Sequence, residues 1–539
     1  MLPHSRACRP WRTLWLALVS LALPVWLLAG CLKVGPDFSR PDSALTQAWL
    51  EAQDTRILAG QPLTKQWWKV FGDPRLESLV LEAYEQNLDL RTAGLRVLEA
   101  RAQLAVAVGS LYPQTQQISA SNAYSVPSQR GATAAQPGMR GGATSFWQDS
   151  AGLNLAWELD FWGKYRRGVE GYQAALESQI ADYDNALVSL TAQVATSYVT
   201  LRTAQRRLAI ARGNVAVQRE GLKIAEARHR HGATSELDVQ QALNVLHSTQ
   251  ATIPDLEKSV RQAGHALSLY LGRPPMAWRE LEENAGAIPN APPQVATGIP
   301  ADLLRRRPDI RKAERDAAAQ CARVGVAKAD LYPSFSLSGN LGLQASNVGA
   351  YGLADIASSQ AFTAGFSPTL TWNIFNYGQI VNKMRVQDAK LQQALTDYQG
   401  KVLSALKDVE DALVSFLRAQ DQSVFLGEAA KSARQAVDLS YTQYREGQTY
   451  YTTVLVAQQN LLTAEDNLAS AQGAIALNLI TLFKGLGGGW ELREGRDFVP
   501  AAVQEEMSGR TDWGALLPER TQEKKDQPAG EPWPQAPVW

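Results

Sequence analysis

Apolar residues recur along the chain with two different periods, and the longer period predicts very long helices. From residue 180 to residue 222 an apolar side chain stands at every seventh position, and a second series with several small residues follows three places on. This heptad pattern is typical of helices that pack along a coiled-coil seam. We expect one helix from about Tyr165 to Arg230, roughly 100 Å long at 1.5 Å per residue. Residues 395–437 repeat the pattern, and an ordinary dimeric coiled coil is the alternative. The first series consists of Ile180, Leu187, Val194, Leu201, Leu208, Val215 and Leu222.

Shorter segments before each heptad region alternate between apolar and polar residues. They cover residues 147–159, 334–343 and 367–374, while residues 114–126 are polar on both faces and give the weakest signal. A period of two predicts strands whose faces meet different environments. About ten such residues, with Trp and Phe near the ends, fit an outer-membrane β-barrel with lipid outside and water inside. The edge of a soluble β-sandwich is the alternative.

The two halves of the chain repeat one another. Leu111-Tyr112-Pro113 recurs 220 residues later as Leu331-Tyr332-Pro333, and Trp157 recurs 215 residues later as Trp372. Matches that keep these spacings over much of the chain indicate two copies of one structural unit. Each copy has the order helix, strand, loop, strand, very long helix, tight turn, helix.

Counting strands predicts an oligomer. Two hairpins supply four strands, whereas a closed membrane barrel has about eight or more. An open sheet would leave unpaired edges in lipid. The barrel must therefore be shared between chains. The loops at 127–146 and 344–363 are rich in Gly, Ala and Ser, as expected for exposed hairpin tips.

The N-terminus has the pattern of a signal peptide. Three arginines precede an apolar run from Leu14 to Leu28, which ends in Leu28-Ala29-Gly30-Cys31. This ending resembles a bacterial lipobox, which implies cleavage before Cys31 and covalent diacylglycerol and palmitoyl-type N-acyl lipid on that cysteine. Leu32, rather than Asp, favours sorting to the outer membrane. A plain secretory signal is the alternative.

Composition excludes several classes of protein. The 539 residues contain 53 Lys plus Arg and 53 Asp plus Glu, and this balance argues against a nucleic-acid partner. Loss of the signal leaves the mature chain at about −3. Three cysteines are too few for a disulfide scaffold, and Cys321 would be the only free thiol after processing.

Motifs for catalysis or cofactor binding are lacking in the sequence. There is no Walker loop, zinc-spaced Cys/His set or Gly-x-Ser-x-Gly elbow. His229 and His231 are two apart on a helix, so they point to different sides. We therefore expect no metal, no cofactor besides the acyl lipid, and no enzyme. Residues 490–539 are predicted to form a flexible tail.

Several motifs together identify a family. The stretch from Cys31 to about Gly488 resembles an outer-membrane factor lipoprotein of the NodT and TolC-like efflux family. The motifs that carry the resemblance are Trp67-Trp68, Phe71-Gly72-Asp73-Pro74, Asn87-Leu88-Asp89-Leu90, Trp157–Gly163, Leu303–Ile310 and Tyr332-Pro333.

The resemblance implies an α+β membrane protein that works as a homotrimer. Its twelve strands would close one β-barrel, continued by a periplasmic α-helical barrel of coiled-coil helices. It would be the outer membrane channel of a tripartite efflux pump, joined by a periplasmic adaptor to an inner-membrane transporter, expected to be of the RND type.

We expect the following organisation along the chain. A signal peptide (1–30) precedes an acylated N-terminal and equatorial segment (31–80), repeat 1 (81–275, hairpin 114–159), an equatorial linker (276–308), repeat 2 (309–489, hairpin 334–375) and the tail (490–539).

The helical tips are the expected functional region. Gly232 and Gly447 end the long helices, and glycine suits the tight turn that follows. With Tyr444 they are the candidate adaptor contacts.

The resemblance also implies that the helix pair beyond these turns closes the periplasmic mouth with aspartates and ionic links. Asp238 stands where a linking aspartate is expected, but Thr449, Thr453 and Val456 replace an arginine and aspartates, with Thr452 one turn before Val456. We predict a neutral aperture held by packing and by hydrogen bonds of about 1 kcal/mol each. The alternative is that Asp238 and these threonines are only solvated turn residues.

Three other functions remain open from the sequence. One is a periplasmic coiled-coil structural or adaptor lipoprotein without a pore, another is a type I protein-secretion duct, and the third is a secreted enzyme on a helical stalk.

Overall fold

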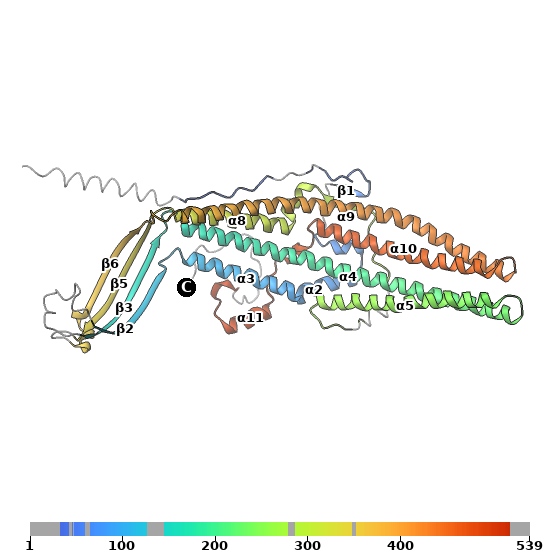
Figure 1. Cartoon of the computed structure of the whole chain (residues 1–539), viewed down its shortest axis with the longest axis horizontal. Coiled ribbons are helices and arrows are strands. Elements are labelled where there is room, and N and C mark those ends of the chain that lie inside the picture. The colour runs from blue at the N-terminus through green and yellow to red at the C-terminus, as the bar shows by residue number, and fades with distance from the viewer. Residues whose placement is uncertain are drawn as a thin grey trace, which may run out of the picture.

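The computed structural model describes residues 33–42, 46, 48–59, 65–126, 145–276, 278, 286–347 and 352–517. The predicted signal peptide, Cys31 and most of the first hairpin loop lie outside these residues. The molecule is elongated, with the strands at one end and the turns of two long helix pairs at the other (Figure 1). No helix among the described residues is long and apolar enough to cross a membrane.

The two predicted repeats have matching elements. Repeat 1 contains α3 (Leu88–Gly109), β2 (Thr115–Ser125), β3 (Phe146–Leu159), α4 (Lys164–Arg230) and α5 (Glu236–Tyr270). Repeat 2 contains α8 (Pro308–Ala329), β5 (Ser334–Ser346), β6 (Phe362–Thr371), α9 (Gln379–Arg445) and α10 (Tyr451–Gly485). The predicted long helix is confirmed, and α4 and α9 each have 67 residues.

Besides short 3-10 helices, five further elements occur in the described part of the chain. They are β1 (Ile57–Ala59), α2 (Pro74–Gln86), β4 (Val295–Gly298), α7 (Leu303–Arg306) and α11 (Ala501–Arg510). β1 and β4 form a parallel pair, so the N-terminal segment and the linker between the repeats meet there. The tip of the second hairpin carries two short 3-10 helices, Leu353–Ala357 and Ser359–Ala361.

The four predicted strands form one antiparallel sheet in the order β2-β3-β5-β6. The two hairpins are joined through β3 and β5, where Leu153 lies opposite Leu341. β2 and β6 are the two edges of this sheet. Most apolar side chains of the four strands share one face, because directly opposed residues lie on the same side of a sheet.

The main core lies where the long helices cross the equatorial segments. Trp67 and Trp68 are fully buried, and the Trp67 ring stacks on Phe483 of α10 at 5.5 Å between centroids. Along α4, the heptad residues Leu187, Val194 and Leu201 are also buried. The apolar seam therefore holds the helices together from the inside, as the heptad pattern predicts.

The long helices end at their predicted glycines. Gly232 and Gly447 have φ values of 70° and 77°, a left-handed conformation that glycine adopts without steric cost. In each turn the next residue donates a backbone hydrogen bond of 2.8 Å back into the helix end. This closure satisfies carbonyl groups that the helix end leaves free.

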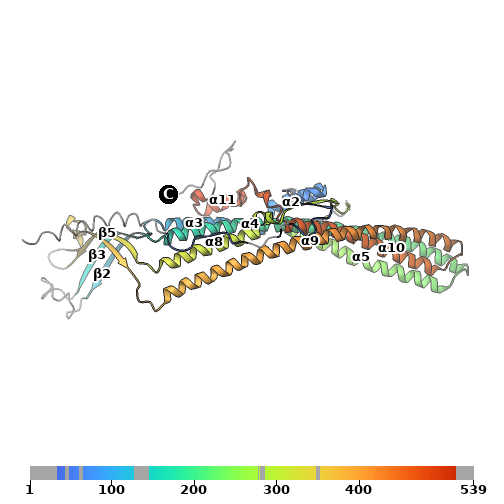
Figure 2. The same cartoon turned by 90° about the horizontal axis from the view of Figure 1, so that it is seen from above.

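The predicted flexible tail is wrong for residues 490–517. This segment packs against α3 beside α4 (Figure 2), with Val499, Met507 and Leu517 buried against Leu98. Gly94 of α3 makes the close approach possible, since a Cβ there would lie 2.1 Å from the Phe498 carbonyl oxygen. Residues 518–539 lie outside the described part of the chain.

A buried carboxylate ties this segment to both repeats. Asp184 of α4 has no exposed side-chain surface, and it accepts from Arg493 at 2.7 Å and from Arg311 of α8 at 3.3 Å. Burial raises the pKa of Asp184, and the two guanidinium groups oppose that shift. Loss of either arginine would leave a buried charge with less compensation.

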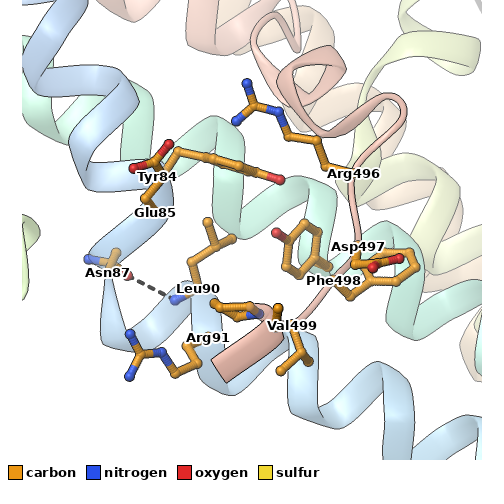
Figure 3. A pocket seen from close by; sticks show the side chains of 12 residues that line it. Tyr84, Glu85, Asn87, Leu90, Arg91, Arg496, Asp497, Phe498 and Val499 are labelled. Atoms are coloured by element: carbon orange, nitrogen blue, oxygen red, sulfur yellow. Dashed lines mark hydrogen bonds between the residues drawn. The ribbon is translucent and has the colours of Figure 1, made fainter. Parts of the chain in front are cut away.

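A cavity of about 260 Å³ remains between the C-terminal segment and the junction of α2 and α3. Figure 3 shows Tyr84 and Leu90 facing Phe498 across it. The Arg496 guanidinium lies 4.9 Å from the Tyr84 ring centroid. Aromatic and cation–π contacts therefore supplement the apolar packing of the segment.

Replacing Arg493 tests this attachment. We expect Arg493→Ala to lower the free energy of unfolding by about 2 kcal/mol, because Asp184 keeps only Arg311. The matched control is Arg510→Ala, whose guanidinium forms an exposed pair with Glu506. Thermal unfolding of the purified protein is the measurement. The deficit should shrink as the pH falls toward the raised pKa of Asp184, since a protonated carboxyl no longer needs a counter-charge. Equal unfolding temperatures for the two variants would contradict the proposed attachment.

Candidate functional site

The residues predicted to form an aperture lie at the tip of the second helix pair. Thr452, Thr453 and Val456 are exposed on the first two turns of α10, and Val456 keeps 57% of its surface. The Thr449 hydroxyl donates to the Thr453 hydroxyl at 3.0 Å. Two of the predicted threonines thus form a hydrogen bond between neutral groups. The exposed side chains of Thr452, Thr453 and Val456 carry no charge.

Asp238 lies in the first turn of α5, on the other helix pair. Its carboxylate accepts from the Thr234 hydroxyl within its own turn. An acidic group is favourable at this position because the helix N-terminus carries partial positive charge. Within the single chain, the predicted linking aspartate Asp238 therefore accepts a hydrogen bond from its own turn rather than from the other helix pair.

Arg228 is a tip residue that the sequence pattern did not single out. Its Nη1 donates to the carbonyl oxygen of Tyr444, and its guanidinium lies 4.4 Å from the Tyr444 ring centroid. Tyr444, a predicted adaptor contact, is itself 98% buried, and its ring lies 4.9 Å from the Tyr451 ring at a tilt of 50°. The last turn of α4 thereby holds the last turn of α9 through one side chain.

A second link lies two turns from the tip. Gln458 of α10 donates to the Tyr441 hydroxyl, which itself donates to the backbone oxygen of Val217 in α4 at 3.2 Å. Burial raises the pKa of Tyr441 to about 12, so the phenol stays neutral and able to donate. Gly221 leaves the necessary space, because a Cβ there would lie 2.6 Å from this hydroxyl.

Charged side chains continue the same line of contact toward the equator. Arg207 of α4 forms a bidentate pair with Asp466 of α10 at 2.7 and 2.9 Å. Asn214 donates to Glu465 at 3.3 Å. The two helix pairs therefore meet through polar contacts along this line, in addition to the apolar cluster around Ala225 and Val454 at the tip.

His229 at the tip has ordinary partners. His229 lies 3.2 Å from Glu236, and its other ring nitrogen lies 3.2 Å from the Thr234 carbonyl oxygen. The described residues contain no group of three His, Cys, Asp or Glu side chains that could hold a metal ion.

Comparison with known proteins gives a consistent family. The family described as outer membrane efflux protein matches residues 79–273 and 299–488. Nodulation protein T of Rhizobium leguminosarum bv. trifolii is 32% identical over 86% of this chain and 96% of its own length. The pyoverdine export outer membrane protein OpmQ of Pseudomonas aeruginosa is 31% identical over 86% of this chain and 96% of its own length.

The fold is similar to that of a solved outer-membrane channel. The solved structure of the outer-membrane channel OprN has a TM-score of 0.77 and 34% sequence identity, and the match covers 85% of this chain and 99% of that structure. The family match ends at residue 488, so the C-terminal segment 490–517 lies beyond it.

The glycine at the second link gives a direct test. Gly221→Ala should loosen the tip, because the added methyl group displaces the Tyr441 hydroxyl. Gly213→Ala on the same helix is the matched control, since its Cβ would meet nothing within 4 Å and alanine favours a helix by about 1 kcal/mol. We expect protease cleavage near the tip to accelerate only in Gly221→Ala. The same cleavage rate in both variants would count against the link.

Proposed function

This chain belongs to the outer membrane efflux protein family, and we propose that its helical tips form a neutral aperture for the channel that the family builds. The protein is the outer membrane channel of a tripartite efflux system. Three copies form the channel, which works with a periplasmic adaptor and an inner-membrane pump. An RND-type pump is part of our proposal. The one observation that carries the channel function is the four-stranded amphipathic sheet with two unpaired edges, continued by helices of 67 residues.

Conduction through this protein needs no catalysis. The family is described by efflux and the relative OpmQ by export, and we infer that this chain likewise performs no reaction. Substrates delivered by the pump would pass through a water-filled lumen, which the polar face of the sheet and the exposed faces of the long helices can line.

We propose that acyl lipid on Cys31 anchors the chain beside its own barrel. The described residues just after the cysteine support this placement. The backbone N–H of Val34 donates to the Trp162 carbonyl oxygen at 3.1 Å, next to the membrane end of α4. The buried Arg167 guanidinium donates to the carbonyl oxygens of Val34 and Gly35. Two or more acyl chains supply the stable membrane attachment that one chain does not.

The closed state of the aperture would depend on neutral contacts and on Arg228. The Thr449–Thr453 hydrogen bond and the exposed Val456 offer no site for a cation. Arg228 holds the tip of α9 within the same copy. Asp238, Thr452, Gly232 and the other tip residues would then position the adaptor and shape the mouth rather than lock it by charge.

Electrical recording tests the channel function. Purified protein added to planar lipid bilayers should give discrete conductance steps, because three copies enclose a water-filled lumen. Verified insertion without any conductance would support the alternative of a structural lipoprotein.

Divalent cations test the neutral aperture. We expect micromolar calcium or magnesium to leave the conductance unchanged, because hydroxyl and methyl groups bind these ions far more weakly than carboxylates do. Thr453→Asp should create cation block, since three copies would then place three carboxylates at the mouth. Thr396→Asp, an exposed position far from the tip on α9, is the matched control and should not create block. Cation block of the unaltered protein would overturn the proposal.

A further inference from the structure

The two edge strands of the sheet, β2 and β6, need partner strands from other copies. The internal repeat predicts the register in which they pair. Within one copy, repeat 1 meets repeat 2 through the β3–β5 ladder. If three copies surround one axis, repeat 2 of each copy meets repeat 1 of the next in an equivalent way. β6 then takes the place of β3, and β2 of the next copy takes the place of β5.

The first strands of the two hairpins, β2 and β5, are offset by one residue less than the sequence motif that precedes them. Ala156 and Thr371 are equivalent by the shift of 215, and their ladder partners are Thr115 and Ser334. The first strands of the two hairpins therefore correspond by 219 residues, although the motif before them repeats at 220. The extra residue is Gln114, whose side chain caps the end of the β2–β3 ladder by accepting from the N–H of Glu158 at 2.7 Å.

This one-residue difference decides which face of β2 meets lipid. A slip of one residue exchanges all inward and outward side chains of a strand. With the shift of 220, Leu370 would lie opposite Ser119, so the apolar face of β6 would continue into the opposite face of β2. With the shift of 219, Leu370 lies opposite Ala120, whose partner within the copy is Ala151 on the apolar face.

We propose that β6 pairs with β2 of the next copy in this register, with Leu370 opposite Ala120 and Thr369 opposite Ser121. This inference rests on the proposed channel of three copies, and it adds which residues of β6 and β2 meet between neighbouring copies. In the same register, Phe366 lies opposite Tyr124 and Trp372 lies opposite Ile118. These four side chains are exposed in the single copy, at 74%, 55%, 55% and 85% respectively.

The register continues the aromatic residues across the boundary between copies. Within one copy, the Tyr124 ring lies 5.0 Å from Trp147. Phe366 of the neighbouring copy extends this row, which gives a girdle of aromatic side chains at one rim, as is typical of membrane barrels. On the other face Thr369 and Thr371 meet Ser121 and Ser119, so the lumen side stays polar.

The equivalence of the two repeats also predicts a partner in the next copy for an exposed apolar residue of the long helices. Ile210 of α4 and Leu468 of α10 line one hollow at the contact between repeats. Their equivalents, 215 residues away, are Phe425 of α9 and Ile253 of α5 in the next copy. Phe425 keeps 76% of its surface in the single copy, and this apolar partner would cover it.

Cysteine cross-linking tests the register. In Thr369→Cys/Ser121→Cys, the two thiols of adjacent copies should form disulfides on mild oxidation, giving covalent dimers and trimers on denaturing gels. Within a copy they cannot pair, because the two edge strands are separated by three strand spacings of about 4.8 Å. Thr371→Cys/Ser119→Cys is a second on-register pair. Adjacent pairs alternate in side-chain separation, and these two pairs share one class.

The matched control is Thr369→Cys/Gln117→Cys, which lies on the same face but about 13 Å off register at 3.3 Å per residue. Cys321 is buried and stays in place. We expect this control to remain monomeric on the gel. Cross-linking of the control, or no cross-linking of either on-register pair in a folded outer-membrane trimer, would overturn the register. Bilayer conductance of the reduced variants separates such a failure from a failure of the channel function.

Discussion

The unpaired edges of the four-stranded sheet are the constraint on which the rest of the structure depends. In the described part of the chain, β2 and β6 are the edges of the sheet, so each has one row of backbone N–H and C=O groups with no strand beside it. In a bilayer each unsatisfied group costs several kcal/mol. Only closure removes that cost. Four strands are too few to enclose a lumen, so closure requires further copies, and the long helices must follow the strands around the same axis.

Below the sheet, the chain separates two kinds of contact. Apolar side chains bury the seams along the long helices, and Leu187, Val194 and Leu201 of α4 have almost no exposed surface. Between the two helix pairs, polar contacts from the Arg207–Asp466 pair to the Arg228 contact supplement an apolar cluster at the tip. Apolar burial is insensitive to small changes of direction, whereas bidentate ion pairs need a defined geometry. The apolar contacts thus supply buried area, and the specific polar side chains set the position of one helix pair against the other.

The sequence was sufficient for features that depend on periodic patterns. The heptads predicted α4 and α9, the alternation predicted the strands, and the two glycines predicted the turns. Contacts without a period were missed. Arg228 reads as one of several arginines near a helix end, and only the fold shows that it reaches Tyr444. Residues 490–517 carry their apolar side chains at irregular spacing, yet Val499 and Met507 are buried in one cluster with Leu98 of α3. The extra residue at Gln114 is visible only in the ladder, where strand pairing reveals the offset.

The central claim is that three copies share one barrel, and a reconstruction of the protein in lipid nanodiscs by electron cryo-microscopy tests it most directly. We predict a threefold particle with twelve strands in a closed ring, each copy contributing four adjacent strands, above one continuous tube of helices. A particle in which the edges of the sheet stay unpaired, or in which each chain closes its own sheet, would contradict the account.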